Sequence, residues 1–193
     1  FRRVLFRSRD ADMFIKEKTG IITIGITPNR PETGYGYIQF TDKSESIGTH
    51  EIKEVHSFKE KPSFEMAKEY IADGHYLWNA GMFMFNSEFM KTQYRMYAND
   101  TYKILTSLPD ITSSNYKEEL EKKYAMCEAI SIDFAIMEKT DKLFVIPSDF
   151  GWDDVGSWMS IERYLVKDES GNIIKGEVKA ENSKNNTVFT TTK

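Results

Sequence analysis

Residues 21–40, IITIGITPNRPETGYGYIQF, contain the pattern that decides the fold. Residues 21–26 are a short apolar run rich in β-branched side chains, which is typical of a buried strand. The following segment, residues 27–31, carries two prolines and ends that strand in a loop. Residues 35–40 then alternate as a second strand. In open α/β sheets ligands bind at strand ends, so polar residues in such loops are candidates for a binding site.

Strand and helix patterns alternate outward from this stretch. Further strands are expected at residues 51–58, 81–85, 142–146, 173–178 and 187–190, and helices at residues 63–73, 86–97, 100–108, 115–124, 131–139 and 161–165. Ser63 and Asn86 are expected to cap their helices, and the spacing from Asn115 to Glu118 resembles a capping box. This order predicts an α/β domain with a mixed sheet, followed by the beginning of a β module.

The composition is that of an ordinary globular domain. The chain has 193 residues, 40% of them apolar and 29% charged, and a net charge of -4. The acidic balance argues against a nucleic-acid partner, and no stretch approaches the roughly 20 apolar residues of a membrane span. Cys127 is the only cysteine. A disulfide within the chain and a Cys-rich metal cluster are therefore excluded, and a reducing, cytoplasmic setting is expected.

The two ends differ in character from the rest of the chain. The basic run FRRVLFRS leads abruptly into Arg9, and residues 1–9 are predicted to be a non-native scar, with a short basic helix as the alternative. The other end stops at residues 191–193, directly after a strand-like segment. Both ends are therefore expected to be cuts.

Two segments near the second strand place unusual residues at strand ends. TGYGY, residues 33–37, has glycines that let a ligand approach the backbone closely, although a tight turn has the same pattern. In FKEKP, Pro62 is expected to hold Lys61 in an extended conformation. The Glu60 carboxylate suits paired sugar hydroxyls and the Lys61 ammonium suits a phosphate. A solvated charge cluster before a helix is the alternative.

Two later segments add an amide and a pair of carboxylates. In YLWNAG, Asn79 offers a donor and an acceptor beside Trp78, as sugar sites do; a turn residue next to a core tryptophan is the alternative. In DFGWDDVGSW, Asp153 and Asp154 lie between tryptophans and glycines, where two carboxylates are costly without a cation. Mg²⁺ takes one or two protein carboxylates and completes its shell with water and phosphate oxygens. An acidic turn that caps the following helix is the alternative.

Together and in this order, these segments resemble the mannose-1-phosphate guanylyltransferases of the nucleotidyltransferase superfamily. The matching pieces, within residues 21–186, are ITPNRPETGYGYI, FKEKP, WNAGMFMF, SIDFAIMEK and GWDDVGSW. The resemblance implies a Rossmann-like domain with a mixed sheet, followed by a left-handed β-helix. Residues 10–166 would then be the sugar-phosphate-binding part of the nucleotidyltransferase domain, and residues 167–193 the truncated start of the β module.

The resemblance also implies a reaction and roles for individual residues. The reaction transfers GMP from GTP to mannose 1-phosphate and gives GDP-mannose and pyrophosphate, with the sugar phosphate as the nucleophile. Carried over by motif, Glu60 and Asn79 bind mannose hydroxyls, and Gly36 contacts the sugar through its backbone. Lys61 holds the sugar phosphate, Asp154 binds Mg²⁺, and these two are the expected catalytic residues. Catalysis then rests on positioning and charge neutralisation.

Departures from the family pattern leave alternatives open. The glycine-rich loop for the GTP phosphates and a second metal-binding aspartate are missing, so the chain is expected to be an inactive fragment of an active, oligomeric bacterial parent. Asp153 is expected to support the site without binding the ion. The alternatives are a nucleotidyltransferase for another pair, such as glucose 1-phosphate with dTTP or ATP, and a non-catalytic homologue that binds a sugar nucleotide. The parent continues either as a β-helix or as a fused phosphomannose isomerase.

Overall fold

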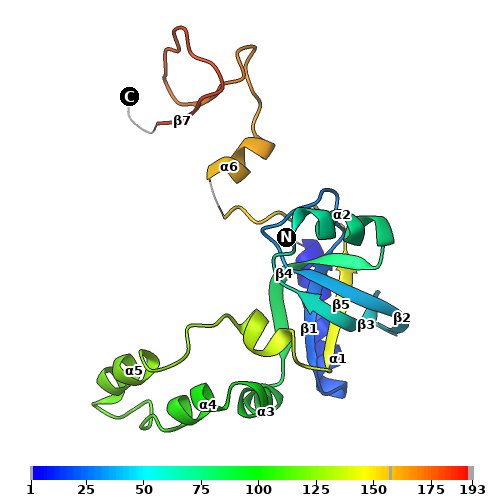
Figure 1. Ribbon diagram of the computed structural model, residues 1–193, viewed down its shortest axis with the longest axis vertical. Coiled ribbons are helices and arrows are strands. Elements are labelled where there is room, and N and C mark those ends of the chain that lie inside the picture. The colour runs from blue at the N-terminus through cyan, green and yellow to red at the C-terminus, as the bar shows by residue number, and fades with distance from the viewer. Residues whose placement is uncertain (1, 157, 191–193) are drawn as a thin grey trace. The chain divides into compact units, whose positions relative to one another are not determined.

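The computed structural model describes residues 2–156 and 158–190, which form two compact units, Phe1–Gly151 and Trp152–Lys193. Figure 1 shows the elements of each unit. In chain order they are α1 (Arg2–Glu17), β1 (Ile21–Ile26), β2 (Tyr37–Ile47), β3 (His50–Lys59), α2 (Phe64–Asp73), β4 (Tyr76–Phe85), α3 (Ser87–Tyr97), α4 (Asn99–Thr106), α5 (Tyr116–Tyr124), the π-helix η1 (Asp133–Met137), β5 (Leu143–Ser148), α6 (Trp158–Ile161), the 3₁₀-helix η2 (Glu162–Tyr164), β6 (Ile173–Lys175) and β7 (Thr187–Phe189).

The first unit is built on a mixed sheet of five strands. The strands follow the order β1–β4–β2–β3–β5, and pairing between β5 and β1 closes the sheet on itself. β1 and β5 run parallel, from the pair Ile21 and Leu143 to the pair Ile26 and Ser148, while the other pairs are antiparallel. The mixed α/β sheet predicted from the sequence is therefore confirmed, and its closure is a feature that the alternating pattern did not indicate.

Two apolar clusters pack against this sheet. Ala11 and Phe14 of α1 are buried against a strand cluster that includes Ile22 and Ile146. A second cluster joins sheet residues such as Ile38 to Met90 of α3 and to η1. From this second cluster α3, α4 and α5 lead away from the sheet (Figure 1). Because this second cluster includes residues of η1, side chains of that helix pack directly against the strands.

Helix α1 covers most of the segment whose origin is in question. It is helical from residue 2 onward, as in the alternative of a short basic helix, and it continues to Glu17. Asp10 is buried in this helix, 2.6 Å from His50 Nδ1, and accepts a hydrogen bond from Thr49 N at 3.0 Å. Burial acts to raise the pKa of Asp10, but the hydrogen bonds from His50 and Thr49 outweigh it and hold the pKa below its usual range. Asp10 thereby fixes α1 to the β2–β3 turn, and the scar at residues 1–9 stays a prediction.

Helix caps follow the sequence in two of three cases. The side chain of Ser63 accepts from Met66 N at the start of α2, and Asn86 caps α3 in the same way. Gly74 ends α2 in a left-handed conformation, with φ of 81°. The capping box predicted at Asn115 is wrong, because that side chain makes no cap hydrogen bond to α5.

The second unit contains a short parallel pair of strands. β6 pairs with β7 from Ile173 and Thr187 to Lys175 and Phe189. Asn172 is buried beside this pair, and Asp168 accepts a hydrogen bond from its backbone N–H at 2.8 Å. A continuation as a β-helix stays a prediction, as does the assignment of residues 167–193 to a β module, and the stop at residues 191–193 lies outside the described residues.

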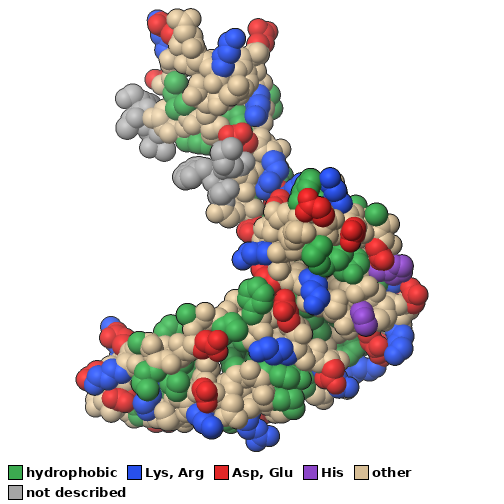
Figure 2. All heavy atoms as spheres, viewed as in Figure 1, with side chains coloured by type: hydrophobic (Ala, Val, Ile, Leu, Met, Phe, Trp, Pro, Cys, Tyr) green, Lys and Arg blue, Asp and Glu red, His purple; other side chains and the backbone are tan. Residues whose placement is uncertain are grey.

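The surface of the described chain is mixed in charge. On the face shown in Figure 2, acidic and basic side chains are interspersed over the first unit and form no large area of one sign. None of the described helices has the length and apolar character needed to cross a membrane.

Candidate functional site

Three of the predicted site residues meet at the beginning of β2. The N–H of Asn79 on β4 donates to the carbonyl oxygen of Gly36 at 2.8 Å. A methyl group built on Gly36 would lie 2.4 Å from Glu60 Oε2 and 3.4 Å from Asn79 Cβ. Gly36, Glu60 and Asn79 therefore meet at one point, where only a glycine leaves room for the Glu60 carboxylate against the backbone.

Lys61 joins this group in an unexpected backbone conformation. Its φ is 48°, so the extended conformation predicted from Pro62 is wrong. A proline favours an extended backbone for the residue before it, so the positive φ of Lys61 departs from that preference. The N–H of Lys61 donates to Tyr35 O at 3.3 Å, which ties this turn to the loop before β2. Lys61 Nζ lies 3.5 Å from Glu60 Oε1, and its side chain is 63% exposed where that of Glu60 is 12% exposed.

A bulge in β4 positions the Asn79 side chain. Gly25 of β1 pairs with Asn79, but Thr23 pairs with Phe83, so residues 80–82 of β4 face a single residue of β1. Gly81 lies in this bulge with φ of 67°, a conformation that suits glycine. Its N–H donates to Asn79 Oδ1 at 3.0 Å, and Thr23 Oγ1 donates to the same oxygen at 3.3 Å. Bulges commonly redirect a side chain beside a functional site.

Two carboxylates that the sequence analysis did not assign complete the group. Asn79 Nδ2 donates to Asp133 Oδ1 at 3.4 Å, and the N–H of Glu60 donates to Glu138 Oε1 at 3.1 Å. Both acids belong to the SIDFAIMEK motif, and Asp133 opens the π-helix η1. Helices of this type are rare and often lie at functional sites. The motif itself was the only sequence signal that pointed to these two residues.

The cluster of Gly36, Glu60, Lys61, Asn79, Asp133 and Glu138, which we treat as the candidate pocket, is rich in acceptors. Burial raises the pKa of Glu60, and the charges of Asp133 and Glu138 raise it further, while Lys61 opposes the shift. Burial likewise raises the pKa of Asp133, with Lys61 again opposing. Ionised carboxylates accept hydrogen bonds only, so they match hydroxyl donors, whereas the exposed ammonium of Lys61 matches an anion. The arrangement suits a ligand with hydroxyls at one end and a phosphate at the other.

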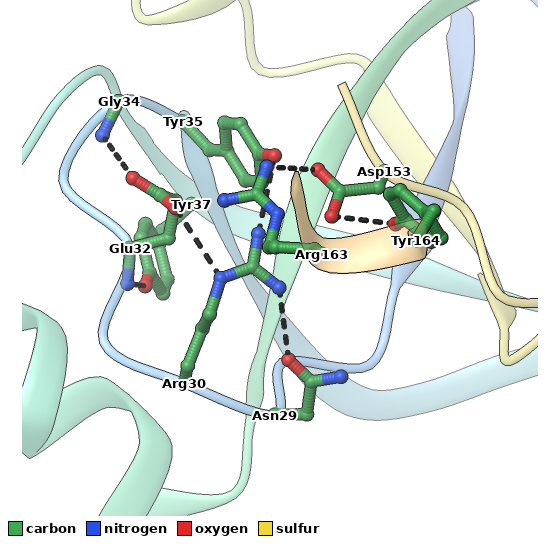
Figure 3. A network of polar contacts seen from close by, with 9 residues as sticks. All are labelled: Asn29, Arg30, Glu32, Gly34, Tyr35, Tyr37, Asp153, Arg163 and Tyr164. Carbon is green, nitrogen blue, oxygen red and sulfur yellow. Dashed lines mark hydrogen bonds and ion pairs between the residues drawn. The ribbon is translucent and has the colours of Figure 1, made fainter. Parts of the chain in front are cut away.

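The loop that leads to Gly36 is held by a polar and aromatic network (Figure 3). Arg30 Nε lies 3.3 Å from Glu32 Oε2, and the Arg30 guanidinium carbon lies 4.8 Å from the centre of the Trp78 ring. Arg30 also donates to Tyr35 Oη at 3.3 Å, and the N–H of Glu32 donates to Tyr37 Oη at 3.1 Å. These contacts fix the loop between β1 and β2, and with it the position of Gly36.

The predicted metal ligand, Asp154, and its neighbour Asp153 belong to the second unit. Asp153 accepts from Arg163 at 2.8 Å and from Tyr164 Oη at 2.6 Å, one bond to each carboxylate oxygen (Figure 3). The neighbouring Asp154 is exposed. No group of three or more His, Cys, Asp or Glu within residues 2–156 and 158–190 is arranged to hold a metal ion. An exposed carboxylate is nevertheless the kind of donor that Mg²⁺ shares with substrate phosphates. Convergence of Asp154 with the pocket stays a prediction.

Comparison with known proteins identifies relatives along most of the chain. A family model described as Nucleotidyl transferase matches residues 11–171. Mannose-1-phosphate guanylyltransferase 2 of Escherichia coli O157:H7 is 38% identical over 177 residues, which are 88% of this chain and 36% of that protein. The alginate biosynthesis protein AlgA of Pseudomonas aeruginosa is 38% identical over 173 residues, 88% of this chain and 35% of that protein. The chain thus spans about a third of the length of these relatives.

Solved structures agree with the sequence relatives. A crystal structure named mannose-1-phosphate geranyltransferase, from Thermus thermophilus, matches with a TM-score of 0.71 and 34% identity. The match covers 88% of this chain and 48% of that one. A mannose-6-phosphate isomerase from Helicobacter pylori matches with a TM-score of 0.60 and 25% identity, over 76% of this chain and 56% of that chain. These likenesses confirm the predicted fold class of the first unit.

Proposed function

Because the chain belongs to the nucleotidyl transferase family, we propose that it binds mannose 1-phosphate as part of an enzyme that transfers GMP from GTP to this sugar phosphate. The products are GDP-mannose and pyrophosphate. Relatives named mannose-1-phosphate guanylyltransferase support this substrate pair. The observation that carries the proposal is the meeting of Glu60, Asn79 and Gly36 beside the exposed ammonium of Lys61.

Each residue of the pocket has a role in this proposal. The Glu60 carboxylate accepts from a mannose hydroxyl, and Asn79 donates to a hydroxyl oxygen. Gly36 contacts the sugar through its backbone, and the absence of a side chain at this position leaves room for the Glu60 carboxylate beside it. Lys61 neutralises the phosphate and directs its oxygen at the α-phosphorus of GTP. The sugar phosphate is the nucleophile, so the protein acts by holding the reacting groups in line and by neutralising charge.

Asp154 is proposed as the Mg²⁺ ligand. The ion would share the phosphate oxygens and neutralise their charge, which is how Mg²⁺ serves phosphoryl transfer. Asp153 is proposed to keep this segment in place through Arg163 and Tyr164, since those two residues engage both of its carboxylate oxygens.

The setting of the enzyme is also a proposal. The named relatives are bacterial, and one is an alginate biosynthesis protein, which supports a role in supplying GDP-mannose for polysaccharides. We place the enzyme in the cytoplasm, where its nucleotide substrate is made, and expect a homo-oligomer with GTP and GDP-mannose as its ligands. The single cysteine agrees with a reducing compartment.

Calorimetric titration of the chain with mannose 1-phosphate tests the proposal. Binding is expected for mannose 1-phosphate and not for mannose, and Lys61→Ala should weaken it by about 10-fold or more, the loss of one charge-assisted contact. Lys59→Ala is the matched control, because Lys59 is an exposed lysine two residues away in the same segment. Equal losses in the two variants, or no binding by the wild type, would contradict the proposal. Tighter binding of glucose 1-phosphate would favour the alternative substrate pair.

A further inference from the structure

The carbonyl oxygen of the Asn79 side chain is fully used inside the protein. It accepts from the Gly81 N–H at 3.0 Å and from Thr23 Oγ1 at 3.3 Å. An amide oxygen has two lone pairs, so these two donors saturate it. A backbone N–H can only donate, which identifies the atom facing Gly81 as the oxygen and sets the orientation of the amide. Asn79 therefore has no acceptor left for a ligand, contrary to the expectation from the sequence.

The amide nitrogen is held from the opposite side. Asn79 Nδ2 donates one hydrogen to Asp133 Oδ1 at 3.4 Å. An ionised carboxylate can only accept, so the contact with Asp133 requires the same amide orientation as the contact with Gly81. Among the described residues Nδ2 has no second hydrogen-bond partner, and one N–H is left for a ligand.

Asn79 and the Glu60 carboxylate are both neighbours of Gly36. Glu60 Oε2 and Asn79 Cβ are 2.4 Å and 3.4 Å from the point that a side chain of Gly36 would fill. Gly36 is therefore packed against two residues of opposite hydrogen-bonding character, Asn79 with one N–H still to donate and Glu60 with a carboxylate that accepts. A hydroxyl group is the one common sugar substituent that accepts and donates at the same atom.

We infer that Asp133 is a positioning residue, which together with Thr23 and Gly81 fixes Asn79 as a donor and so selects a sugar hydroxyl that accepts from Asn79 and donates to Glu60. The inference rests on the proposed sugar-phosphate function and deepens it. It predicts that the pocket rejects a hexose 1-phosphate that lacks this hydroxyl or carries an ammonium in its place, because neither substituent accepts a hydrogen bond from Asn79.

The titratable surroundings of Asp133 separate a positioning role from a structural one. Asp133 faces the carboxylates of Glu60 and Glu138 and the ammonium of Lys61, and burial raises its pKa. A carboxyl whose pKa is raised in the folded protein ionises less readily there than in the unfolded chain. It therefore lowers the free energy of unfolding increasingly as the pH rises above its unfolded pKa. Asp133→Asn should therefore raise the unfolding temperature at neutral pH. A residue kept for stability would show the opposite.

The first test needs no ligand. In NMR spectra of the chain, the side-chain NH₂ group of Asn79 should show one hydrogen-bonded proton, whose signal shifts in Asp133→Ala and stays close to its wild-type position in Asp133→Asn. The amide oxygen of the asparagine variant can still accept this hydrogen bond. Asp141→Ala is the control, since Asp141 is an exposed carboxylate of the same unit. Unchanged Asn79 signals in Asp133→Ala would overturn the inference.

The second test uses mannose 1-phosphate and its monodeoxy analogues. One analogue should bind the wild type about 10-fold more weakly, the effect of one lost hydroxyl contact. Asp133→Ala should weaken the binding of mannose 1-phosphate to a similar degree but should not weaken the binding of that analogue any further. Asp133→Asn should bind mannose 1-phosphate with most of the wild-type affinity. Equal sensitivity of every analogue to Asp133→Ala would overturn the inference. If the wild type binds no hexose phosphate, the proposed function and the inferred sugar ligand are both wrong. The NMR signals of Asn79 then still show whether Asp133 fixes the amide.

Discussion

Gly36→Ala is the substitution that addresses the pocket most directly. Gly36 is not in a left-handed conformation, so alanine at this position meets no backbone strain. The effect comes from space alone, because the new methyl carbon would lie 2.4 Å from Glu60 Oε2 and 3.2 Å from Phe58 Cζ. The buried ring of Phe58 has little room to move, whereas the end of the Glu60 side chain can rotate away.

The size of the effect follows from that displacement. Atoms in contact lie roughly 3.5 Å apart, so the Glu60 carboxylate must retreat by about 1 Å. A hydrogen bond from a hydroxyl to a carboxylate is worth about 1.5–3 kcal/mol, and its loss weakens binding by about 10- to 100-fold. The fold itself should lose about 1–3 kcal/mol, which is typical of an extra methyl group in a packed site.

Calorimetric titration with mannose 1-phosphate, together with thermal unfolding, measures both quantities. Gly34→Ala is the matched control in the same loop, since its methyl would lie 3.4 Å from Glu32 Oε1, an ordinary contact. We expect Gly34→Ala to bind as the wild type does. Wild-type affinity in a folded Gly36→Ala variant would refute the reasoning, because it would mean that the Glu60 carboxylate does not contact the ligand.

Four further substitutions test the contacts of Asp10, Arg30, Asp153 and Asp154. The pKa of Asp10 is below its usual range, so the ionised carboxylate contributes fully to stability above the unfolded pKa of about 3.9. This contribution is lost as the pH falls through the folded pKa. Asp10→Asn should therefore lower the free energy of unfolding at pH 7 and make that free energy fall less steeply in acid, as measured by denaturation at several pH values. Arg30→Lys should lower the thermal stability by about 0.5–2 kcal/mol, because lysine replaces neither the stacking on Trp78 nor the planar hydrogen-bonding group; an unchanged unfolding curve would contradict this. Asp153→Asn should loosen the second unit in hydrogen exchange, because it weakens the contacts with Arg163 and Tyr164. Asp154→Asn should weaken Mg²⁺ binding, as measured by titration with the ion, and an unchanged affinity for Mg²⁺ would contradict its proposed role.

Local sequence patterns were enough to predict most of the elements and two of the three caps, but not α1, which was expected only as a short basic helix and as the alternative to a scar. The apolar run of β1 and the caps at Ser63 and Asn86 each depend on neighbouring residues only. The same holds for the segments that hold Gly36, Glu60 and Asn79, because each lies where a strand pattern meets a turn pattern. Such signals act over a few residues and are visible in the sequence.

The features that could not be predicted depend on contacts between distant residues. Thr23 and Asp133 reach Asn79 from 56 and 54 positions away, through a bulge whose register is set by the pairing of β1 with β4. The positive φ of Lys61 likewise occurs where its N–H donates to Tyr35, 26 positions earlier in the chain. Periodicity carries no information about such pairings, since the register of two strands is fixed by the whole sheet. The sequence therefore suggested that the side-chain oxygen of Asn79 accepts from the ligand, whereas in the structure it accepts from Thr23 and Gly81.

The raised pKa values in the pocket lead to one more prediction. Burial and mutual repulsion make ionised Glu60 and Asp133 unfavourable in the free protein, and Lys61 offsets this only in part. A ligand hydroxyl that donates to Glu60 stabilises the ionised form and lowers its pKa. Binding should therefore release protons and strengthen as the pH rises through the free-state pKa of Glu60.

Calorimetry in buffers of different ionisation enthalpy measures this release. The ligand phosphate also titrates near pH 6, and Glu60→Gln separates the two sources because it keeps the phosphate and removes the carboxyl. The variant should bind more weakly and release fewer protons than the wild type. Equal proton release in the two proteins would mean that the ligand does not donate to Glu60. An acidic pocket that lowers stability when empty is best explained by such a ligand, because an amide at position 60 would fill the same volume without the charge.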